Sequence, residues 1–186
     1  MHEFEKDGYY NLLIIVPTLD LVEQWKEELA AFNYKKVLNV SSLNLTWRKE
    51  LLDIVQKVKR GKDVNSAIVS TYDSFVNKDF QTLLPSISTS MILIADEAHN
   101  IGGKNVRACF RKLNIPRRIA LSATPERIYD EEGTNEIGEF FNDSRPYIYS
   151  FPMSKAIHEG RLCKYYYYPK VAYLNDEEMG RYAYLS

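Results

Sequence analysis

Two adjacent carboxylates are the sharpest chemical signal in this sequence. Asp96 and Glu97 follow directly after the apolar run 91–95. A carboxylate at the end of a buried strand can hold Mg²⁺, usually through water, beside the phosphates of a nucleotide. An adjacent carboxylate can then accept a proton from an attacking water molecule. The alternative is a pair of solvated acids at the positive end of a helix, but the preceding apolar run favours a functional site.

A histidine and two hydroxyls lie at the right spacing to join this site. His99 comes three residues after Asp96, and Ser122 and Thr124 end or follow the apolar run 118–122. We expect His99 to turn toward the neighbouring strand end and to contact these two hydroxyls. The alternative is a purely structural histidine, with Ser122 and Thr124 acting as helix or turn caps.

Polar residues also follow two further apolar runs. Pro17 and Thr18 come after one run, and Ser70 and Thr71 end another. Hydroxyls and backbone amides at such junctions can hold a phosphate backbone without reading its base sequence. Each residue alone is more typical of a helix cap. Because the carboxyl ends of parallel strands meet at one edge of a sheet, we expect all of these residues to share one surface.

Short apolar runs alternate with amphipathic stretches along residues 12–122, which predicts an α/β fold with a mainly parallel sheet and crossover helices. Trp25 and Trp47 are interpreted as core anchors on two of these helices. Thr46 is expected to cap the second helix and Gly61 to stop it. The predicted strands cover residues 12–16, 37–40, 67–70, 91–95 and 118–122.

The composition of the sequence changes after Pro125. Residues 126–144 are polar and acidic and are expected to form a long loop around a short helix. The segment 147–149 is predicted to return to the sheet, and 153–159 to form one more helix. We therefore place a domain boundary near residue 150, with a linker or exit segment over 151–186.

Composition excludes several classes of protein. The chain has 186 residues, 45% hydrophobic and 26% charged, and a formal net charge of -1. Because the chain as a whole carries no excess of positive charge, any contact with nucleic acid must come from a few locally placed groups. Cys109 and Cys163 suggest neither a disulfide framework nor a metal site, so a cytoplasmic setting is expected. The sequence has no apolar run of membrane-spanning length and no signal peptide.

Four segments in this order resemble the first motor domain of superfamily-two helicases. They match motifs Ia, Ib, II in its DEAH form, and III: VPTLDLVEQWKEEL (16–29), VSTYDSF (69–75), ADEAH (95–99) and LSATP (121–125). The Gln-Trp in the first segment and the Pro-Glu-Arg at 125–127 are similar to the branch of excision-repair translocases and type I and type III restriction-enzyme motor subunits. The segment AIHEGRL (156–162) resembles the passage that leaves this domain.

The resemblance implies a RecA-like three-layer αβα domain that uses ATP and Mg²⁺. It implies that Asp96 coordinates Mg²⁺ and that Glu97 activates water for ATP hydrolysis. It also implies that His99, Ser122 and Thr124 couple the nucleotide state to the nucleic-acid path, along which lie Pro17, Thr18, Ser70 and Thr71. The implied partners are nucleic acid, with DNA favoured over RNA, a second motor domain of the same chain, and restriction or repair subunits.

One departure from the family pattern is large. A phosphate-binding loop reads Gly-x-x-x-x-Gly-Lys followed by Ser or Thr, so that backbone amides and the lysine cradle the phosphates. Neither 61–63 nor 103–105 fits this pattern. We therefore expect a fragment that begins after the loop, so that residues 1–150 form a partial motor domain incomplete at its N-terminus. The isolated chain is expected to be inactive as an ATPase.

Two other functions stay open at this point. The chain could be a non-catalytic module, derived from a helicase domain, that binds nucleic acid or a partner protein. An in-frame Gly-Lys-Thr or Gly-Lys-Ser loop upstream of Met1 would favour the motor instead. An unrelated α/β hydrolase is disfavoured because the sequence has no Gly-x-Ser-x-Gly elbow.

Overall fold

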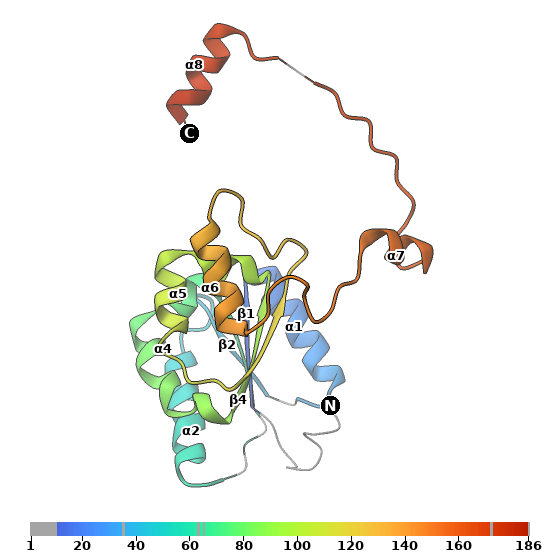
Figure 1. Cartoon of the computed structure of the whole chain (residues 1–186). Helices are drawn as coiled ribbons and strands as arrows, with labels where there is room; N and C mark the ends of the chain where they lie inside the picture. Colours follow the sequence, from blue (N-terminus) through green and yellow to red (C-terminus); the bar gives the residue numbers. More distant parts are fainter. Residues whose placement is uncertain (1–10, 35, 63, 65, 172, 186) are drawn as a thin grey trace. The chain divides into compact units, whose positions relative to one another are not determined.

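The computed structural model describes residues 11–34, 36–62, 64, 66–171 and 173–185 (Figure 1). The chain divides into two compact units, of which the first ends at Pro146 and the second begins at Tyr147. The candidate site residues all belong to the first unit.

The first unit is built on a five-stranded parallel sheet with the strand order β2-β3-β1-β4-β5. The five predicted strands are confirmed to within one residue at each end. The predicted strand at 147–149 is wrong, since these residues carry no regular structure. The strands are β1 (Asn11–Val16), β2 (Val37–Val40), β3 (Ala67–Thr71), β4 (Met91–Asp96) and β5 (Arg117–Leu121).

Helices cover both faces of the sheet (Figure 1). Helix α1 (Leu19–Ala31) lies on one face, and the helices on the opposite face are α2 (Trp47–Lys59), α4 (Lys78–Leu83), α5 (Lys104–Phe110) and α6 (Glu131–Phe141). Two short elements follow strand ends directly: α3 (Tyr72–Phe75) after β3, and the 3₁₀ helix η3 (Ala98–Gly102) after β4. The remaining 3₁₀ turns are η1 (Leu84–Ser86) and η2 (Ser88–Ser90).

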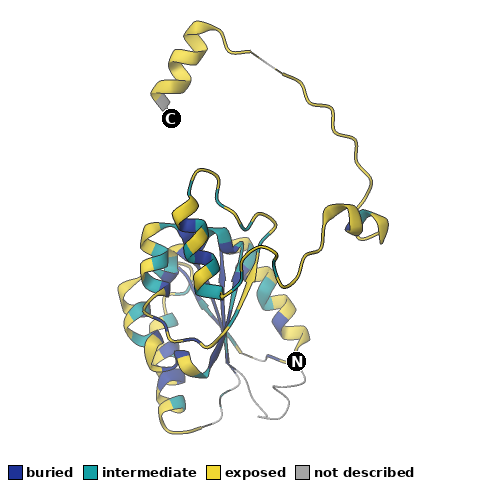
Figure 2. Cartoon of the chain, in the orientation of Figure 1, coloured by how far each residue is buried: buried dark blue, intermediate teal, exposed yellow. Residues whose placement is uncertain are grey.

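The core consists of two apolar layers, one on each face of the sheet. Alternate residues of one strand belong to different layers, so that Leu13 and Ile15 pack with α2, α4 and α5, whereas Ile14 and Val16 pack with α1. Burial on both faces explains why the central strands β1, β3 and β4 appear in the sequence as mainly apolar runs, whereas the edge strand β5 is largely exposed. The buried interior of the sheet is visible between exposed helix faces (Figure 2).

Thr46 occupies the predicted N-cap position of α2, but its side chain does not cap the helix. Thr46 precedes the helix but has φ −98° and ψ −2°, whereas a capping side chain needs an extended backbone. Its hydroxyl lies instead 2.8 Å from Asn44 Oδ1 and 2.9 Å from Glu50 Oε1. The bond to Thr46 lowers the pKa of Glu50. Gly61 follows the end of the helix with φ +66°, a conformation that glycine adopts without strain, which confirms the predicted stop.

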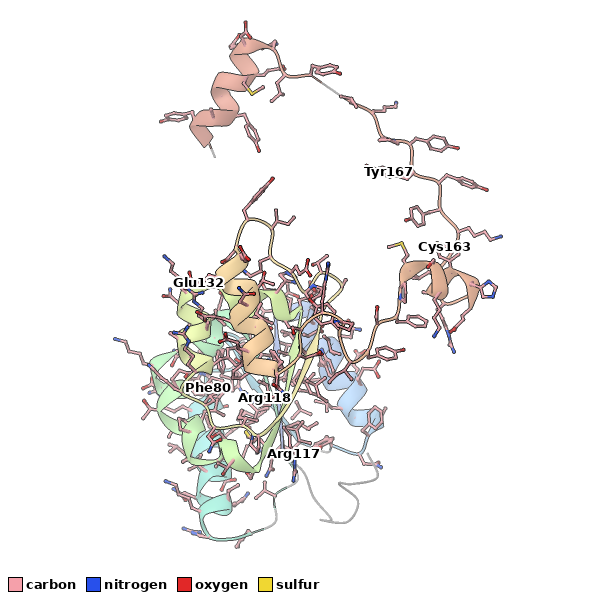
Figure 3. The ribbon with its side chains drawn as sticks, in the orientation of Figure 1. Phe80, Arg117, Arg118, Glu132, Cys163 and Tyr167 are labelled. Carbon is pink, nitrogen blue, oxygen red and sulfur yellow. The ribbon has the colours of Figure 1, made fainter. Side chains whose placement is uncertain are left out.

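Helix α6 is longer than the sequence pattern indicated. It begins after Asp130, whose carboxylate accepts a hydrogen bond from the amide of Gly133 at 2.8 Å. The helix packs on the edge strand β5, where the guanidinium of Arg118 lies 4.5 Å from the centre of the Phe140 ring. Figure 3 shows Arg117 and Arg118 on this strand.

The second unit contains two helices, α7 (Met153–His158) and α8 (Asp176–Leu185). The first agrees with the prediction for residues 153–159, and Gly160 follows it with φ +69°. The described residues between Leu162 and Val171 have no regular structure, as expected for an extended tail. Among the described residues, no helix is long and apolar enough to cross a membrane.

Candidate functional site

Four strands, β3, β1, β4 and β5, have their carboxyl ends in register along one edge of the sheet. Val16 pairs with Thr71, and Ile15 pairs with Ala95 on the other side. Asp96 in turn pairs with Leu121. The residues that end or follow these strands therefore line one continuous edge: Ser70 and Thr71, then Pro17 and Thr18, then Asp96 and Glu97, and finally Ser122.

Asp96 is held by both its side chain and its backbone. The indole N–H of Trp25 donates to Oδ2 at 3.0 Å, and the amide of Glu97 donates to Oδ1 at 3.0 Å. The hydroxyl of Tyr72 donates to the backbone carbonyl of Asp96 at 2.9 Å. Burial, reinforced by the charges of Asp96 and Glu97, raises the pKa of Tyr72, so this hydroxyl keeps the proton that it donates.

Glu97 adopts a backbone conformation that is rare outside glycine. Its φ of 48° and ψ of 54° are left-handed, which costs about 1–2 kcal/mol for a residue with a side chain. The turn is held because the Glu97 carbonyl accepts hydrogen bonds from both the side-chain amide and the backbone amide of Asn100, at 2.8 and 3.0 Å. This turn leads the chain from β4 into η3 and leaves the Glu97 side chain 40% exposed. Strained residues of this kind gather at functional sites.

His99 joins the ends of β4 and β5. Its Nδ1 lies 3.3 Å from Ser122 Oγ and 3.4 Å from Glu97 Oε2. Its Nε2 lies 3.4 Å from the side-chain amide nitrogen (Nδ2) of Asn100, a group that can donate but not accept a hydrogen bond. A neutral imidazole in this position therefore carries its proton on Nδ1, facing Ser122 and Glu97.

The two predicted hydroxyl partners of His99 differ in what they do. Ser122 contacts the histidine and also accepts a hydrogen bond from the backbone amide of Thr124 at 3.2 Å. Thr124 thus contributes its amide to the cluster, and among the described contacts its hydroxyl makes none with His99. The structure brings His99 and Ser122 together directly, with Thr124 one step away.

The hydroxyls on the other strand ends serve local structure. Thr18 Oγ1 accepts the amide of Leu21 at 3.4 Å and caps α1, and Thr71 Oγ1 accepts the amide of Ser74 at 3.2 Å and caps α3. Ser70 is buried, and its hydroxyl donates to the carbonyl of Val40 at 3.0 Å, which ties β3 to β2. A hollow beside Pro17 and Thr71 is lined by polar residues, among them Ser41, Ser42, Asp73, Ser74 and Asn77, and by apolar ones that include Leu19 and Trp47.

Arg127 fastens the loop after β5 to η3, a role that sequence reasoning missed. Its guanidinium donates to the carbonyl of His99 at 2.6 Å and to the carboxylate of Asp130 at 2.6 Å. Hydrogen bonds from the Gly133 amide and from Arg127 lower the pKa of Asp130. The Pro-Glu-Arg sequence was the available signal, but it did not reveal the partner, which lies 28 residues away.

Gly102 makes room for Arg127, which leads to a testable pair of variants. A Cβ at Gly102 would overlap Arg127 Cδ and lie 2.6 Å from Nε, so Gly102→Ala must push the guanidinium away from His99. We expect this overpacking to lower the free energy of unfolding by about 1–3 kcal/mol. The matched control is Gly103→Ala, whose Cβ would have its nearest neighbour at 3.6 Å. Urea unfolding measures both, and equal stability of the two variants would contradict the assigned role of Arg127.

The donor set around Asp96 fits one kind of cation site. Among the described residues, no group of three or more His, Cys, Asp or Glu side chains is placed to hold a metal ion. Mg²⁺ in nucleotide sites is held by one or two carboxylates together with phosphate oxygens and water, rather than by an all-protein cage. Asp96 suits this arrangement because it is half-buried at a groove that also borders Gln24, Glu28 and Phe32.

Comparisons with known proteins bear on the family and the fold. A family model described as "Type III restriction enzyme, res subunit" matches residues 1–127. No curated protein matches the chain. Among solved structures, the helicase domain of Hef from Pyrococcus furiosus is 23% identical, with a TM-score of 0.50, and the match covers 76% of this chain and 29% of that one.

Two further structures match less closely. A nuclease-deletion mutant of the type ISP restriction-modification enzyme LlaGI, in complex with a DNA substrate mimic, is 19% identical, with a TM-score of 0.46, over 72% of this chain and 13% of that one. A designed P-loop NTPase fold is 16% identical, with a TM-score of 0.37, over 84% of this chain and 99% of that one.

The likeness to the Hef helicase domain concerns the fold, a RecA-like αβα domain, and this chain spans less than a third of that protein's length. The family match is more direct, because it covers more than half of the chain. It includes β1 to β5 and every residue of the candidate site. The chain therefore belongs to the family whose model is described as "Type III restriction enzyme, res subunit".

Proposed function

We propose that this chain is part of the first motor domain of an ATP-dependent helicase or translocase that acts on nucleic acid, with DNA favoured over RNA. The observation that supports the proposal most directly is the cluster at the ends of β4 and β5. There His99 Nδ1 lies within 3.4 Å of both the Glu97 carboxylate and the Ser122 hydroxyl. Through His99, this cluster connects the Glu97 carboxylate at the end of β4 to the Ser122 hydroxyl at the end of β5.

Each residue of the cluster has a proposed task. Asp96 would hold Mg²⁺ through water, and Glu97 would take a proton from the water that attacks ATP. When bound, Mg²⁺ neutralises charge on the phosphates. His99, Ser122 and Thr124 would pass the state of the nucleotide to the strand ends that face nucleic acid.

The proposed nucleic-acid path runs along the ends of β1 and β3. Pro17, Thr18 and Thr71 lie on it, and Ser70 would support it by fixing the end of β2 through Val40. Hydroxyls and helix-start amides can hold phosphates without reading sequence. The net charge of -1 agrees with a local contact through placed groups.

The motor would be completed by parts outside these elements. We propose that residues 1–150 act as part of the first motor domain and that 151–186 form a linker or exit segment toward a second motor domain of the same polypeptide. Transition-state stabilisation by arginines is expected from that second domain. Restriction or repair subunits are the proposed further partners.

We expect the 186-residue chain alone to hydrolyse ATP negligibly. Its sequence contains no Gly-x-x-x-x-Gly-Lys-Ser/Thr loop to cradle the phosphates. A metal carboxylate without that cradle lacks most of the electrostatic stabilisation of phosphoryl transfer. Phosphate release with Mg²⁺ and ATP, with and without DNA, is the measurement. Robust turnover that Glu97→Gln abolishes would contradict this expectation.

The whole proposal is tested on a polypeptide that contains both motor domains. Duplex DNA is expected to stimulate its ATP hydrolysis more than RNA does, and His99→Ala to reduce the stimulation roughly 5–150-fold, the size of a typical coupling between sites. Gln56→Ala, at an exposed position of α2 with no proposed role, is the control and should change nothing. Binding of nucleic acid without turnover in any of these proteins would instead support the non-catalytic module.

A further inference from the structure

Trp25 makes a hydrogen bond that the proposed function does not use. Its indole N–H donates to Asp96 Oδ2 at 3.0 Å across 71 residues of sequence. We propose that Trp25 is a positioning residue, which holds the Asp96 carboxylate in the orientation that receives a divalent cation. This inference rests on the proposed function, because it assigns Asp96 to the cation.

The indole is well suited to this task because its direction is preset. Trp25 is partly buried and packs against the apolar layer under α1, which includes Val22 and Leu29. The ring has a single donor and no acceptor, so it can only donate to the carboxylate. A donor held by packing loses little freedom when it binds, which makes the orientation of its partner well defined.

The hydrogen bonds around Asp96 leave room for a cation. Oδ2 accepts from Trp25 and Oδ1 accepts from the Glu97 amide. Each carboxylate oxygen can accept two hydrogen bonds, so each keeps one position for a metal-bound water. The Tyr72 hydroxyl, on α3, holds the main chain of Asp96, and the Trp25 indole, on α1, holds its side chain. The two parts of Asp96 are therefore fixed independently.

The second tryptophan shows that burial alone does not require such a bond. Trp47 is also partly buried, and its ring packs edge-on against Phe80 at 5.9 Å between centroids. Among the described contacts, its indole N–H has no hydrogen-bond acceptor. Trp47 is therefore a matched reference for Trp25, since it has the same side chain and similar burial but no hydrogen bond to a carboxylate.

Nuclear magnetic resonance of the 186-residue chain tests the hydrogen bond. The chain has two tryptophans and therefore two indole N–H signals, which Trp47→Phe assigns. Asp96→Asn should shift the Trp25 signal upfield and leave that of Trp47 in place, because a bond to a neutral amide is weaker than one to a carboxylate. The control is Glu28→Gln, which removes a charge from the same groove. No shift in Asp96→Asn, or an equal shift in the control, would overturn the proposal.

Titration with Mn²⁺, a paramagnetic substitute for Mg²⁺, tests the positioning. We expect Mn²⁺ to broaden the amide signal of Glu97, and Trp25→Phe to raise the concentration needed about 10-fold, as loss of an outer-shell partner does at metal sites. Trp47→Phe should leave it unchanged. Equal concentrations for wild type and Trp25→Phe would overturn the role of Trp25. Absence of broadening in the wild type would overturn the cation role of Asp96 and the positioning role that depends on it, whatever the indole signals show.

Discussion

Replacing Glu97 by Gln is expected to lower the rate of ATP hydrolysis by the complete motor about 10²- to 10⁴-fold, the usual contribution of a general base. Glutamine has nearly the same shape and cannot take a proton from water. The Asp96 carboxylate keeps the hydrogen bond from Trp25, and the Asp96 carbonyl keeps the one from Tyr72, so nucleotide binding should be unchanged. Steady-state phosphate release and equilibrium binding of a labelled nucleotide measure the two quantities separately.

The comparison with two other carboxylates sharpens this result. Glu27→Gln removes a charge from an exposed position of helix α1 that does not line the groove at Asp96, and should leave the turnover unchanged. Asp96→Asn should weaken Mg²⁺-dependent nucleotide binding, because it removes the proposed cation ligand. Wild-type turnover in Glu97→Gln would mean that another group, or no group, acts as the base.

The strands were predictable because a parallel sheet covered on both faces leaves a strong signal. Runs such as 91–95 are apolar at every position, and each is followed by polar residues where the strand meets solvent. The shared edge was also predictable, because parallel strands put their carboxyl ends together whatever their register. The position of Asp96, Glu97 and Ser122 at one edge therefore followed from the sequence of elements.

The partners of the site residues were not predictable in the same way. Helical periodicity places Trp25 on the buried face of its helix, but it does not show that the indole reaches Asp96 on another element. Likewise, nothing local to Arg127 indicates that its guanidinium meets the carbonyl of His99. Such contacts depend on distances between elements, which are set by packing across the whole sheet.

Weak local patterns account for the remaining errors. Helix α6 contains two glycines and buries only Gly133 and Ile137, so its apolar stripe is short, and its start is set by the Asp130 cap. The segment 147–149 has aromatic and branched residues typical of a strand, yet Ile148 and Tyr149 are exposed. Strand propensity alone therefore does not make this segment a strand.

Phe110→Ala is expected to lower the free energy of unfolding by about 3–5 kcal/mol, the usual cost of removing a buried phenylalanine ring. The ring is 1% exposed, and its centroid lies 4.4 Å from that of Phe75 and 5.3 Å from that of Phe140. It thus joins α5 to α3 and α6, and of these α5 and α6 pack against η3, which carries His99. Urea unfolding followed by circular dichroism measures the change.

Ion pairs at the edge of the α5–α6 interface allow a test of whether aromatic packing or charge provides this stability. Arg107 forms ion pairs with Glu132 at 3.2 Å and with Glu136 at 3.3 Å between α5 and α6, and Figure 3 labels Glu132 on α6. The pair with Glu132, whose side chain is 73% exposed, should contribute about 0–1 kcal/mol, so Glu132→Gln should cost far less than Phe110→Ala. Phe32→Ala, at a ring that is 56% exposed, should change stability by less than about 0.5 kcal/mol. A loss in Glu132→Gln as large as in Phe110→Ala would show that charge, and not the aromatic core, holds these helices beside the site.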